Sequence, residues 1–397
     1  MGSPFFTVLV PTKNRPDLIP DALWSIQRQI FTNFEVFIID NGEEGKLCEE
    51  ATSEFLKDPR FTYLRTGGLS MPDNWEFAYE QGIGQYKLIL SDRLIWSTDE
   101  FLERLHHLLN IHDVPVVSWK YGMLHQAVLT NPHRSRVPMV YRSDDILRKL
   151  GAGDYEFYSQ TSPRGLNSCV RRDLIDRIRA KFGRFCHPFA PDFTSSNLLL
   201  FSEPELLHID ANIVYEADLT DSNGTNCRNN IQYCKKSLSS LGGSWEGSTE
   251  HVPAKIPSVY NTVFNDLLTM AKLTGLKADV GSMIDPVAYF LMIRQDLDHY
   301  IMENNVFKAL SEWDHALSSQ PIAVQQAVRE AISSERKAAP PAGDKRSAAR
   351  KLASRIKQAI LSGRSTESTL KSPSPEEKID VRKAVEEAQH TVFGRLL

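Results

Sequence analysis

Tyr86-Lys-Leu-Ile-Leu-Ser-Asp92-Arg-Leu-Ile-Trp96 is the stretch that decides the fold. Its apolar run is short and stops at the polar sequence Ser91-Asp92-Arg93, which predicts a strand buried on both faces within a parallel sheet. Ligands of open α/β sheets bind beyond the carboxyl ends of the strands, where a carboxylate can hold a divalent cation against a diphosphate. Asp92 is therefore a candidate metal ligand, although a lone Asp at a strand end more often only ends the strand or caps the next helix.

The residues before this stretch alternate between strand-like and helix-like patterns. Strands are predicted at 5–10, 35–40 and 61–65, and helices at 17–30, 47–56 and 72–81. Pro11 is expected to break the first strand. Strands separated by helices of this length pair in parallel through right-handed crossovers. The predicted fold class is therefore α/β, with a central and mostly parallel sheet.

Polar residues gather where these strands end. The loop from Thr12 to Arg15 follows the first strand, Asp40 ends the second, and Ser91-Asp92 ends the fourth. Because the carboxyl ends of parallel strands meet at one edge of a sheet, these side chains are expected to share one crevice. No GxGxxG and no GxxxxGK[ST] follows the first strand, so the sequence argues against dinucleotide and P-loop sites.

Composition places the chain among soluble globular proteins. The 397 residues suggest two or three units, with 41% hydrophobic and 24% charged residues. A net charge of -4 argues against a protein that coats nucleic acid. The five cysteines are scattered without a CxxC pair, which fits a reducing cytoplasm, and no apolar run is long enough for a membrane span. A cytoplasmic location is expected.

Four segments, in this order and spacing, resemble the N-terminal half of family 2 glycosyltransferases. They are Val8-Leu-Val-Pro-Thr-Lys-Asn-Arg15, Phe34-Glu-Val-Phe-Ile-Ile-Asp-Asn41, Met71-Pro-Asp-Asn-Trp75 and Gly84-Gln-Tyr-Lys-Leu-Ile-Leu-Ser-Asp92. The resemblance covers about the first hundred residues well and extends more loosely to about residue 225. It implies the GT-A fold, whose α/β domain binds a nucleotide-diphosphate sugar donor.

The resemblance also implies roles for individual residues. Asp40 would accept a hydrogen bond from the base, usually uracil, and Asp92 would take the metal position of the DxD motif. The whole set implied for nucleotide binding is Pro11, Thr12, Arg15, Asp40, Asn74, Ser91 and Arg93.

The acidic motif departs from the family pattern. Members usually present two or three acidic residues at the end of the fourth strand, and this chain presents Ser91-Asp92-Arg93. A divalent metal, Mn²⁺ or Mg²⁺, is expected at Asp92, although a single carboxylate weakens its binding. The alternative is metal-independent diphosphate binding, in which Arg93 contacts phosphate directly.

The second half of the chain is expected to recognise the acceptor. Asp192 stands just before a helix predicted from Thr194, and the resemblance makes it the general base that removes the proton of the acceptor hydroxyl. Its structural alternative is a helix N-cap, and His187 is the competing base. Thr220 to Gly224 resembles a Ser-Asn-Gly loop that folds back to the donor site in some relatives.

The chain changes character after residue 243. Amphipathic helices are predicted at 259–273, 286–300, 305–317 and 323–332, and no catalytic motif occurs there. Residues 336–364 hold nine basic residues and one acidic residue, which suits either contact with an anionic membrane or a solvated tail. Residues 362–377 are expected to be disordered, with a final helix from Ile379.

Four units follow from these patterns. They are a nucleotide-sugar-binding half at 1–118, an acceptor-binding half at 119–243, a helical appendage at 244–335, and a basic, partly disordered tail at 336–397.

The expected activity is that of an inverting glycosyltransferase. Its donor would be a nucleotide-diphosphate sugar, with a UDP-sugar favoured. Its acceptor would be a saccharide or glycolipid hydroxyl, in bacterial surface polysaccharide or glycoconjugate synthesis. The alternatives are a catalytically weakened GT-A protein that binds a nucleotide sugar or a partner, and a nucleotidylyltransferase. The latter normally relies on a glycine-rich N-terminal loop, which this chain lacks.

Overall fold

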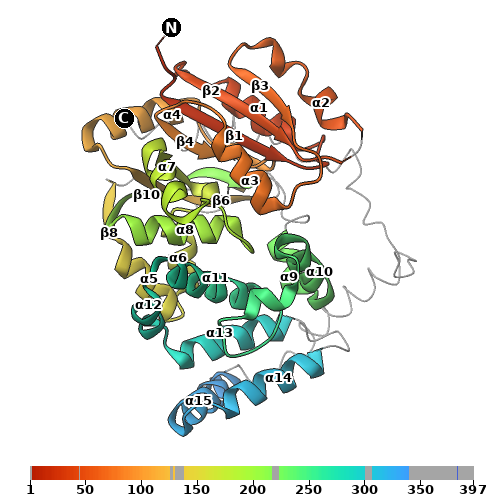
Figure 1. Cartoon of the computed structure of the whole chain (residues 1–397), viewed down its shortest axis with the longest axis vertical. Coiled ribbons are helices and arrows are strands. Elements are labelled where there is room, and N and C mark those ends of the chain that lie inside the picture. Colours follow the sequence, from red (N-terminus) through yellow and green to blue (C-terminus); the bar gives the residue numbers. More distant parts are fainter. Residues whose placement is uncertain are drawn as a thin grey trace.

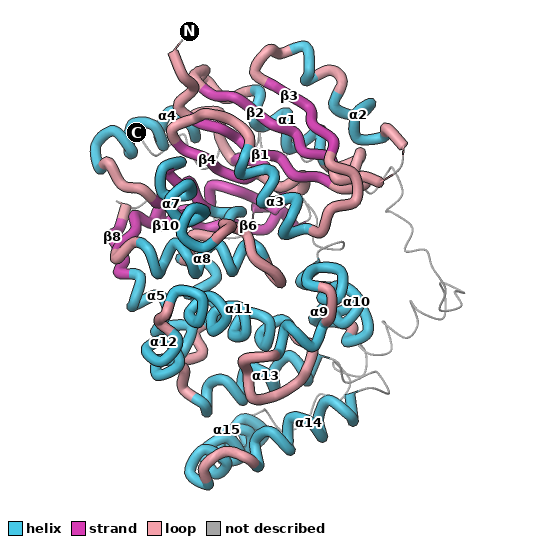
Figure 2. Tube along the Cα trace, viewed as in Figure 1, coloured by secondary structure: helices cyan, strands magenta, loops and turns pink. Residues whose placement is uncertain are grey.

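The computed structural model describes residues 2–43, 45–125, 128–129, 138–216, 223–299, 306–338 and residue 382. Figure 1 shows the strands together with helices α1 to α4 at one end of the molecule. Helices α9 to α15 lie at the other end, with α5 to α8 between the two ends. The chain traced by secondary structure in Figure 2 shows the same division into a strand-rich end and an all-helical end.

The first four strands form the parallel part of one sheet, in the order β3-β2-β1-β4. Their bounds are β1 (Phe6–Thr12), β2 (Phe34–Asp40), β3 (Phe61–Arg65) and β4 (Tyr86–Ile89). The connecting helices are α1 (Ile19–Gln27), α2 (Leu47–Thr52) and α3 (Met71–Glu80). The predicted alternation of strands and helices is confirmed, and with it the α/β class.

Strand β1 does not end at Pro11, as the sequence suggested, but runs on to Thr12. Its pairing with β4 stops at Leu9, whereas its pairing with β2 continues to Thr12. One edge of β1 is therefore unpaired at Pro11, where a residue without an N–H group is tolerated.

The other strands make the sheet mixed. They are β5 (Leu94–Trp96), β6 (Val116–His125), β7 (Val128–Leu129), β8 (Met139–Arg142), β9 (Ser168–Arg171) and β10 (Glu205–Glu216). Strand β9 lies antiparallel between β4 and β6, and β10 pairs with β6 in parallel. The order continues β4-β9-β6-β10-β5, so the sheet joins both halves of the strand-rich region.

The sheet has a helical layer on each face, as the two-residue period of its strands requires. Side chains such as Val8 and Val10 of β1 pack under α1 and α4 (Phe101–His112). Leu9 of the same strand belongs to the opposite core, which also contains residues of α3 and of α7 (Arg172–Phe182).

This second core continues without a break into the C-terminal helices. The helices between the strands and the C-terminal helices in Figure 1 are α5 (Ser143–Gly151), α6 (Tyr155–Thr161) and α8 (Pro191–Ser202). The helices that follow are α9 (Asn223–Asn229), α10 (Ile231–Gly242), α11 (Val259–Thr274), α12 (Lys277–Met283), α13 (Pro286–His299), α14 (Val306–Ser318) and α15 (Ile322–Ala338). A 3₁₀ turn, η3 (Trp245–Thr249), joins α10 to the segment before α11.

Several sequence predictions fall outside the described residues. They include residues 220–222 of the Ser-Asn-Gly loop and most of the basic tail. They also include the predicted disordered segment at 362–377 and nearly all of the final helix. Within the described part of the chain, no helix combines the length and the apolar character that a bilayer span needs.

Candidate active site

A cavity of about 1190 Å³ lies between the carboxyl ends of β1 and β4 and the helices α8 to α11. Its lining includes the predicted site residues Pro11, Thr12, Arg15, Asn74, Ser91, Asp92, Arg93 and Asp192. Residues far apart in the sequence therefore reach one space because the strand ends converge on it, as in other α/β sheets.

Asp92 is buried at the end of β4 and is held by three side chains. Thr12 donates its hydroxyl hydrogen to one carboxylate oxygen at 2.9 Å. Arg15 and Ser91 both donate to the other oxygen at 3.2 Å. The first-strand loop is thereby tied to the end of the fourth strand across the sheet edge. In this arrangement the Arg15 guanidinium neutralises the Asp92 charge.

Asn74 is placed by the first turn of α3, which begins after the N-cap Ser70. Its side-chain oxygen accepts a hydrogen bond from the Thr66 hydroxyl at 2.7 Å. The neighbouring Asn41 binds the backbone of Leu69 at both ends of its amide. These bonds fix the loop between β3 and α3 against the end of β2, on the side of the cavity where the nucleoside is expected.

Asp40 is buried at the end of β2 and does not line the cavity. One of its carboxylate oxygens accepts the N–H of Gly42 at 2.8 Å, and the other accepts the hydroxyl of Tyr63 at 2.6 Å. The carboxylate holds the wall of the cavity together, while its neighbours Asn41 and Glu43 face the space. A hydrogen bond from Asp40 to a base stays a prediction.

Arg93 follows the end of β4 and meets the last residue of β10. Its Nε lies 3.1 Å from a carboxylate oxygen of Glu216. Its Nη1 is buried and has no hydrogen-bond partner among the described residues. Arg93 and Glu216 both line the cavity, so the guanidinium group places a positive charge beside this space.

Asp192 lies in the first turn of α8, not before it. The helix begins at Pro191 rather than at Thr194, and Ala190 is the N-cap residue. The N-cap alternative for Asp192 is therefore wrong, and the reason is local, since proline suits the first position of a helix. The Asp192 carboxylate instead stands at the positive end of the helix dipole.

The charge of Asp192 is set by burial and by arginines. Arg164 lies 3.5 Å from its carboxylate, and Arg93 is close enough to act on it electrostatically. Burial raises the pKa of the Asp192 carboxyl above its ordinary value, while Arg164, the N–H groups of the first turn and Arg93 oppose the rise. A carboxylate whose pKa is raised in this way is a stronger base than an exposed one.

His187, the competing base, does not line the cavity. Its ring Nε2 lies 3.1 Å from the backbone oxygen of Arg184, and its backbone binds the Thr194 hydroxyl. Burial lowers the pKa of this imidazole. The structure therefore places His187 in the support of the loop before α8.

Sequence reasoning missed a group of arginine and aromatic residues in the acceptor half. Arg164 is buried between the rings of Tyr121 and Phe193, each 5.1 Å from its guanidinium carbon. Its Nε has no hydrogen-bond partner in the described chain. Arg228 lies over the rings of Tyr155 and Tyr260 at 5.6 and 5.0 Å. Contacts between residues so distant in the sequence leave no local pattern that identifies them.

Helices α9, α10 and α11 supply a wall of the cavity. Arg228 of α9, Lys236 of α10 and Thr262 of α11 are among its lining residues. Asn223 and Gly224, at the end of the predicted Ser-Asn-Gly loop, also line it. The helical region in which the sequence shows no catalytic motif thus borders the site.

Residues 7–157 match the family described as Glycosyl transferase family 2. The match spans 151 of the 397 residues and makes this part of the chain similar to family 2 glycosyltransferases. No curated protein matches the chain in sequence. The mixed α/β sheet with helices after it is the GT-A fold that the sequence predicted.

Solved structures with a similar chain path include two of S. aureus TarS 1-349. One covers 82% of this chain and 91% of its own at 13% identity, with a TM-score of 0.49. The other, in complex with UDP-GlcNAc, covers 82% and 92% at 13% identity, with a TM-score of 0.48. A mannosyltransferase from Pyrobaculum calidifontis, in complex with GDP-Man and Mn²⁺, covers 80% and 86% at 16% identity, with a TM-score of 0.41. Likenesses of this strength define neither a donor nor an acceptor for this chain.

Few of the residues that line the cavity suit a metal ion. In the described ranges, no three His, Cys, Asp or Glu side chains converge into a cage for an ion. Mg²⁺ needs only one or two carboxylates when substrate phosphates and water complete its shell, so the single carboxylate of Asp92 fits such an ion. The ion would take the place of the Arg15 guanidinium at Asp92.

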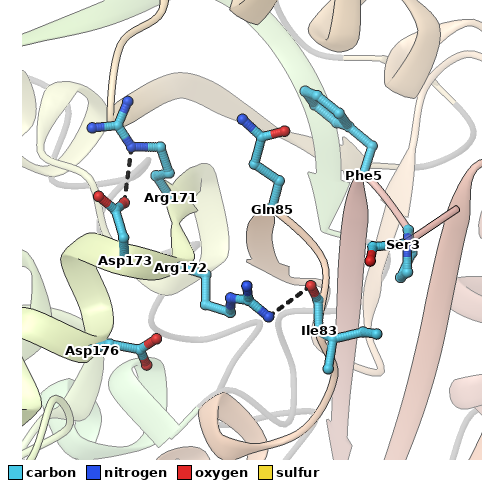
Figure 3. A pocket seen from close by; sticks show the side chains of 9 residues that line it. Ser3, Phe5, Ile83, Gln85, Arg171, Arg172, Asp173 and Asp176 are labelled. Carbon is cyan, nitrogen blue, oxygen red and sulfur yellow. Dashed lines mark hydrogen bonds and ion pairs between the residues drawn. The ribbon is translucent and has the colours of Figure 1, made fainter.

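A second, smaller hollow of about 410 Å³ lies at the opposite edge of the sheet. Figure 3 shows Arg171 turned toward Asp173, and Arg172 turned toward the backbone of Ile83. Both arginines are thus satisfied within the chain, and no predicted site residue borders this space. The large cavity is the candidate active site.

Proposed function

We propose that the protein transfers a sugar from a nucleotide-diphosphate donor to a hydroxyl acceptor, with inversion at the anomeric carbon. A UDP-sugar is the favoured donor, and a saccharide or glycolipid is the favoured acceptor. The observation that carries this proposal is the shared cavity. It joins the strand-end residues Arg15, Asp92 and Arg93 to the buried carboxylate of Asp192. On this proposal, the strand-end residues bind the donor and Asp192 serves as the base, and both roles are carried out in one space.

The diphosphate is proposed to lie across the ends of β1 and β4. Ser91 and Thr12 offer hydroxyl groups there, and Arg93 offers its buried Nη1. A guanidinium group matches the geometry of phosphate oxygens and stays charged at all physiological pH values. The loop from Pro11 to Arg15 and the side chain of Asn74 are proposed to border the base and the nucleoside.

Transfer is proposed to occur as one displacement. The acceptor oxygen forms a bond to the anomeric carbon as the bond from that carbon to the diphosphate oxygen breaks. Asp192 accepts the acceptor proton, and the negative charge that develops on the departing diphosphate is met by Arg93. A divalent ion at Asp92, when bound, would supply further positive charge to the leaving group.

One displacement inverts the configuration because the acceptor attacks the face opposite the leaving group. In this proposal Asp192 is a base and forms no bond to the sugar, so no second displacement restores the original configuration. Arg164 keeps the Asp192 carboxylate charged against the effect of burial. The rings of Tyr121, Tyr155 and Phe193, which line the same space, are proposed to hold the acceptor.

The division of the chain remains a proposal as well. Residues 1–118 are proposed to bind the donor and residues 119–243 the acceptor, followed by the helical region 244–335 and the tail 336–397. Peripheral contact with an anionic membrane through 336–364 stays a prediction, since most of that stretch lies outside the described residues.

The test is the hydrolysis of a panel of nucleotide sugars, followed by the variant Asp192→Asn. Loss of general-base catalysis should lower turnover of the preferred donor by about 10²–10⁴-fold. The amide keeps the shape of the side chain, so affinity for UDP and thermal stability should hardly change. Asp176→Asn is the matched control, because Asp176 is an exposed carboxylate at the smaller hollow.

Two results would contradict the proposal. Full turnover in Asp192→Asn would move the base to another residue of the cavity. Binding of UDP without turnover of any nucleotide sugar by the unaltered protein would instead favour a nucleotide-sugar-binding protein that has lost catalysis.

A further inference from the structure

The segment that leads into α8 is held from two sides by carboxylates, one partly buried and the other completely buried. On one side, Glu76 of α3 accepts the backbone N–H groups of Phe185 and Cys186 at 2.8 and 2.7 Å. On the other side, Asp266 of α11 accepts the N–H groups of Phe189 and Ala190 at 3.3 and 2.9 Å. Each carboxylate thus binds two successive peptide groups of the segment that ends at Asp192.

Asp266 acts at the point where the helix begins. Ala190 is the N-cap residue of α8 and has no side chain able to cap it, and Asp192 follows two residues later. Asp266 is completely buried, and α11 packs along α8. A hydrogen bond to a buried charged acceptor is stronger than one between neutral groups. The position of Ala190, and with it the first turn of α8, is therefore set by a residue of the helical region.

The ring of Phe189 is enclosed by α10 and by η3, which both precede α11 in the chain. A Cβ atom at Gly242, the last residue of α10, would lie 2.2 Å from a ring carbon of Phe189. A Cβ atom at Gly247 in η3 would lie 2.8 Å from another ring carbon. Cys234 and Leu238 of α10 complete this small core around the ring. Glycine is needed at both positions for the backbone to approach the ring this closely.

We propose that Asp266 is the positioning residue of Asp192, acting through the peptide N–H groups of Phe189 and Ala190, so that the helical region is part of the active site. This inference rests on the proposed role of Asp192 as the base. Asp266 touches neither the donor nor the acceptor, since it does not line the cavity. Its effect is to fix the direction from which Asp192 meets the acceptor hydroxyl.

The expected cost of losing this contact follows from the geometry of proton transfer. A displacement of about 1 Å at a reacting group can lower a rate by about 10²-fold. In Asp266→Asn, the amide offers one acceptor oxygen, and its NH₂ group faces an N–H group that can accept nothing. One of the two bonds to residues 189–190 is therefore lost, and the segment is free to shift.

The experiment compares Asp266→Asn with Asp296→Asn in the full chain. Asp296 of α13 is also buried. It accepts the N–H of Tyr260 at 2.8 Å and lies 3.9 Å from the guanidinium group of Arg228, and neither contact involves the segment before α8. Both variants remove a buried carboxylate that binds backbone, so general destabilisation affects both. Burial raises the pKa of Asp266 to about 7. Measurements are therefore made at about pH 8, which is above this pKa, so that the wild-type carboxyl is ionised.

Two readouts are needed. The first is kcat and the donor KM for hydrolysis of the preferred nucleotide sugar. Asp266→Asn should lower kcat by about 10- to 100-fold with an unchanged donor KM, and Asp296→Asn should retain kcat. The second is hydrogen–deuterium exchange of peptides covering residues 185–194, which should accelerate in Asp266→Asn alone. This second readout does not depend on activity.

The outcomes separate the two proposals. An unchanged kcat in Asp266→Asn, or an equal loss of kcat in Asp296→Asn, would overturn the positioning role while the proposed function stands. If the unaltered protein hydrolyses no nucleotide sugar, the proposed function fails. The exchange readout then still decides whether Asp266 holds the segment, and unchanged exchange would overturn that claim.

Discussion

At the scale of single residues, Asp192 and Arg164 illustrate how a charge is tuned inside a protein. Burial alone raises the pKa of the Asp192 carboxyl, and Arg164 lowers it again because a positive neighbour favours the carboxylate. Arg164 is itself buried, so this interaction is only weakly screened by solvent. The protonation of the base therefore depends on a residue that the sequence alone did not single out.

A pH profile tests this coupling. If Asp192 must be ionised for transfer, the rate falls at low pH as the carboxylate takes up a proton. Arg164→Gln removes the positive neighbour, so the pKa of Asp192 rises and the acid limb of kcat/KM moves to higher pH. Arg164→Lys keeps a positive charge and is the control, with a much smaller movement of that limb. An unmoved limb in Arg164→Gln would mean that another group controls the profile.

Asp92 carries the prediction about a metal. Calorimetry with UDP, with and without Mn²⁺, should show that the ion strengthens binding to the unaltered protein but not to Asp92→Ala. The physical reason is that Asp92 is the carboxylate to which an ion bound to the diphosphate would attach. Asp176→Ala serves as the control, since its carboxylate borders the other hollow. Equal UDP affinity in all samples would assign the diphosphate to the arginines alone.

Single residues were predictable from the sequence where local pattern places them. Thr12, Ser91 and Asp92 follow strands, so the strand ends were enough to bring them to one edge. Arg164 and Glu216 could not be found in this way. Their partners Asp192 and Arg93 lie 28 and 123 residues away along the chain, and only tertiary packing brings them together.

At the scale of elements, the start of α8 joins two parts of the molecule. Pro191 at the first helical position was a usable signal for an earlier start than Thr194. The carboxylate that supports this start comes from α11, more than seventy residues later, and no sequence pattern indicates it. Helix lengths were predicted well where apolar periodicity was strong, as in α11 and α14.

The close approach of α10 to Phe189 gives a prediction about stability. Gly242→Ala places a methyl group where the ring already lies, and such overpacking costs about 1–3 kcal/mol of unfolding free energy. Gly281→Ala in α12 is the control, because a Cβ atom there meets nothing within 4 Å. It should be neutral or stabilise by about 0.5–1 kcal/mol, since alanine suits a helix better than glycine. Urea unfolding of both variants measures the difference, and equal stability would show that the Phe189 ring can move aside.

At the scale of the whole molecule, the sheet and the C-terminal helices share one core. Leu9 and Ile89 of the sheet belong to the same apolar cluster as Phe264 of α11 and Phe290 of α13. The sequence predicted the helices but treated them as an appendage, because amphipathic periodicity shows that a face is buried without showing against what. The continuity of the core is a property of the folded chain.

Two truncations test this continuity. A chain that ends after Ala338 keeps every helix of the shared core and loses, among described contacts, those of Arg382, which are an ion pair with Asp21 and a contact with the ring of Trp24. Such a surface pair contributes less than about 1 kcal/mol, so this chain should melt near the full-length temperature and still bind UDP.

A chain that ends after Gly243 loses α11, whose Val263, Phe264 and Leu267 are completely or almost completely buried against the rest of the molecule. Burying one such side chain stabilises the fold by about 1.5–3 kcal/mol, and losing many of them exceeds the usual net stability of a domain. The shorter chain should therefore show no cooperative melt in circular dichroism and no calorimetric binding of UDP. A cooperative melt with normal UDP affinity in that chain would make residues 1–243 an independent unit.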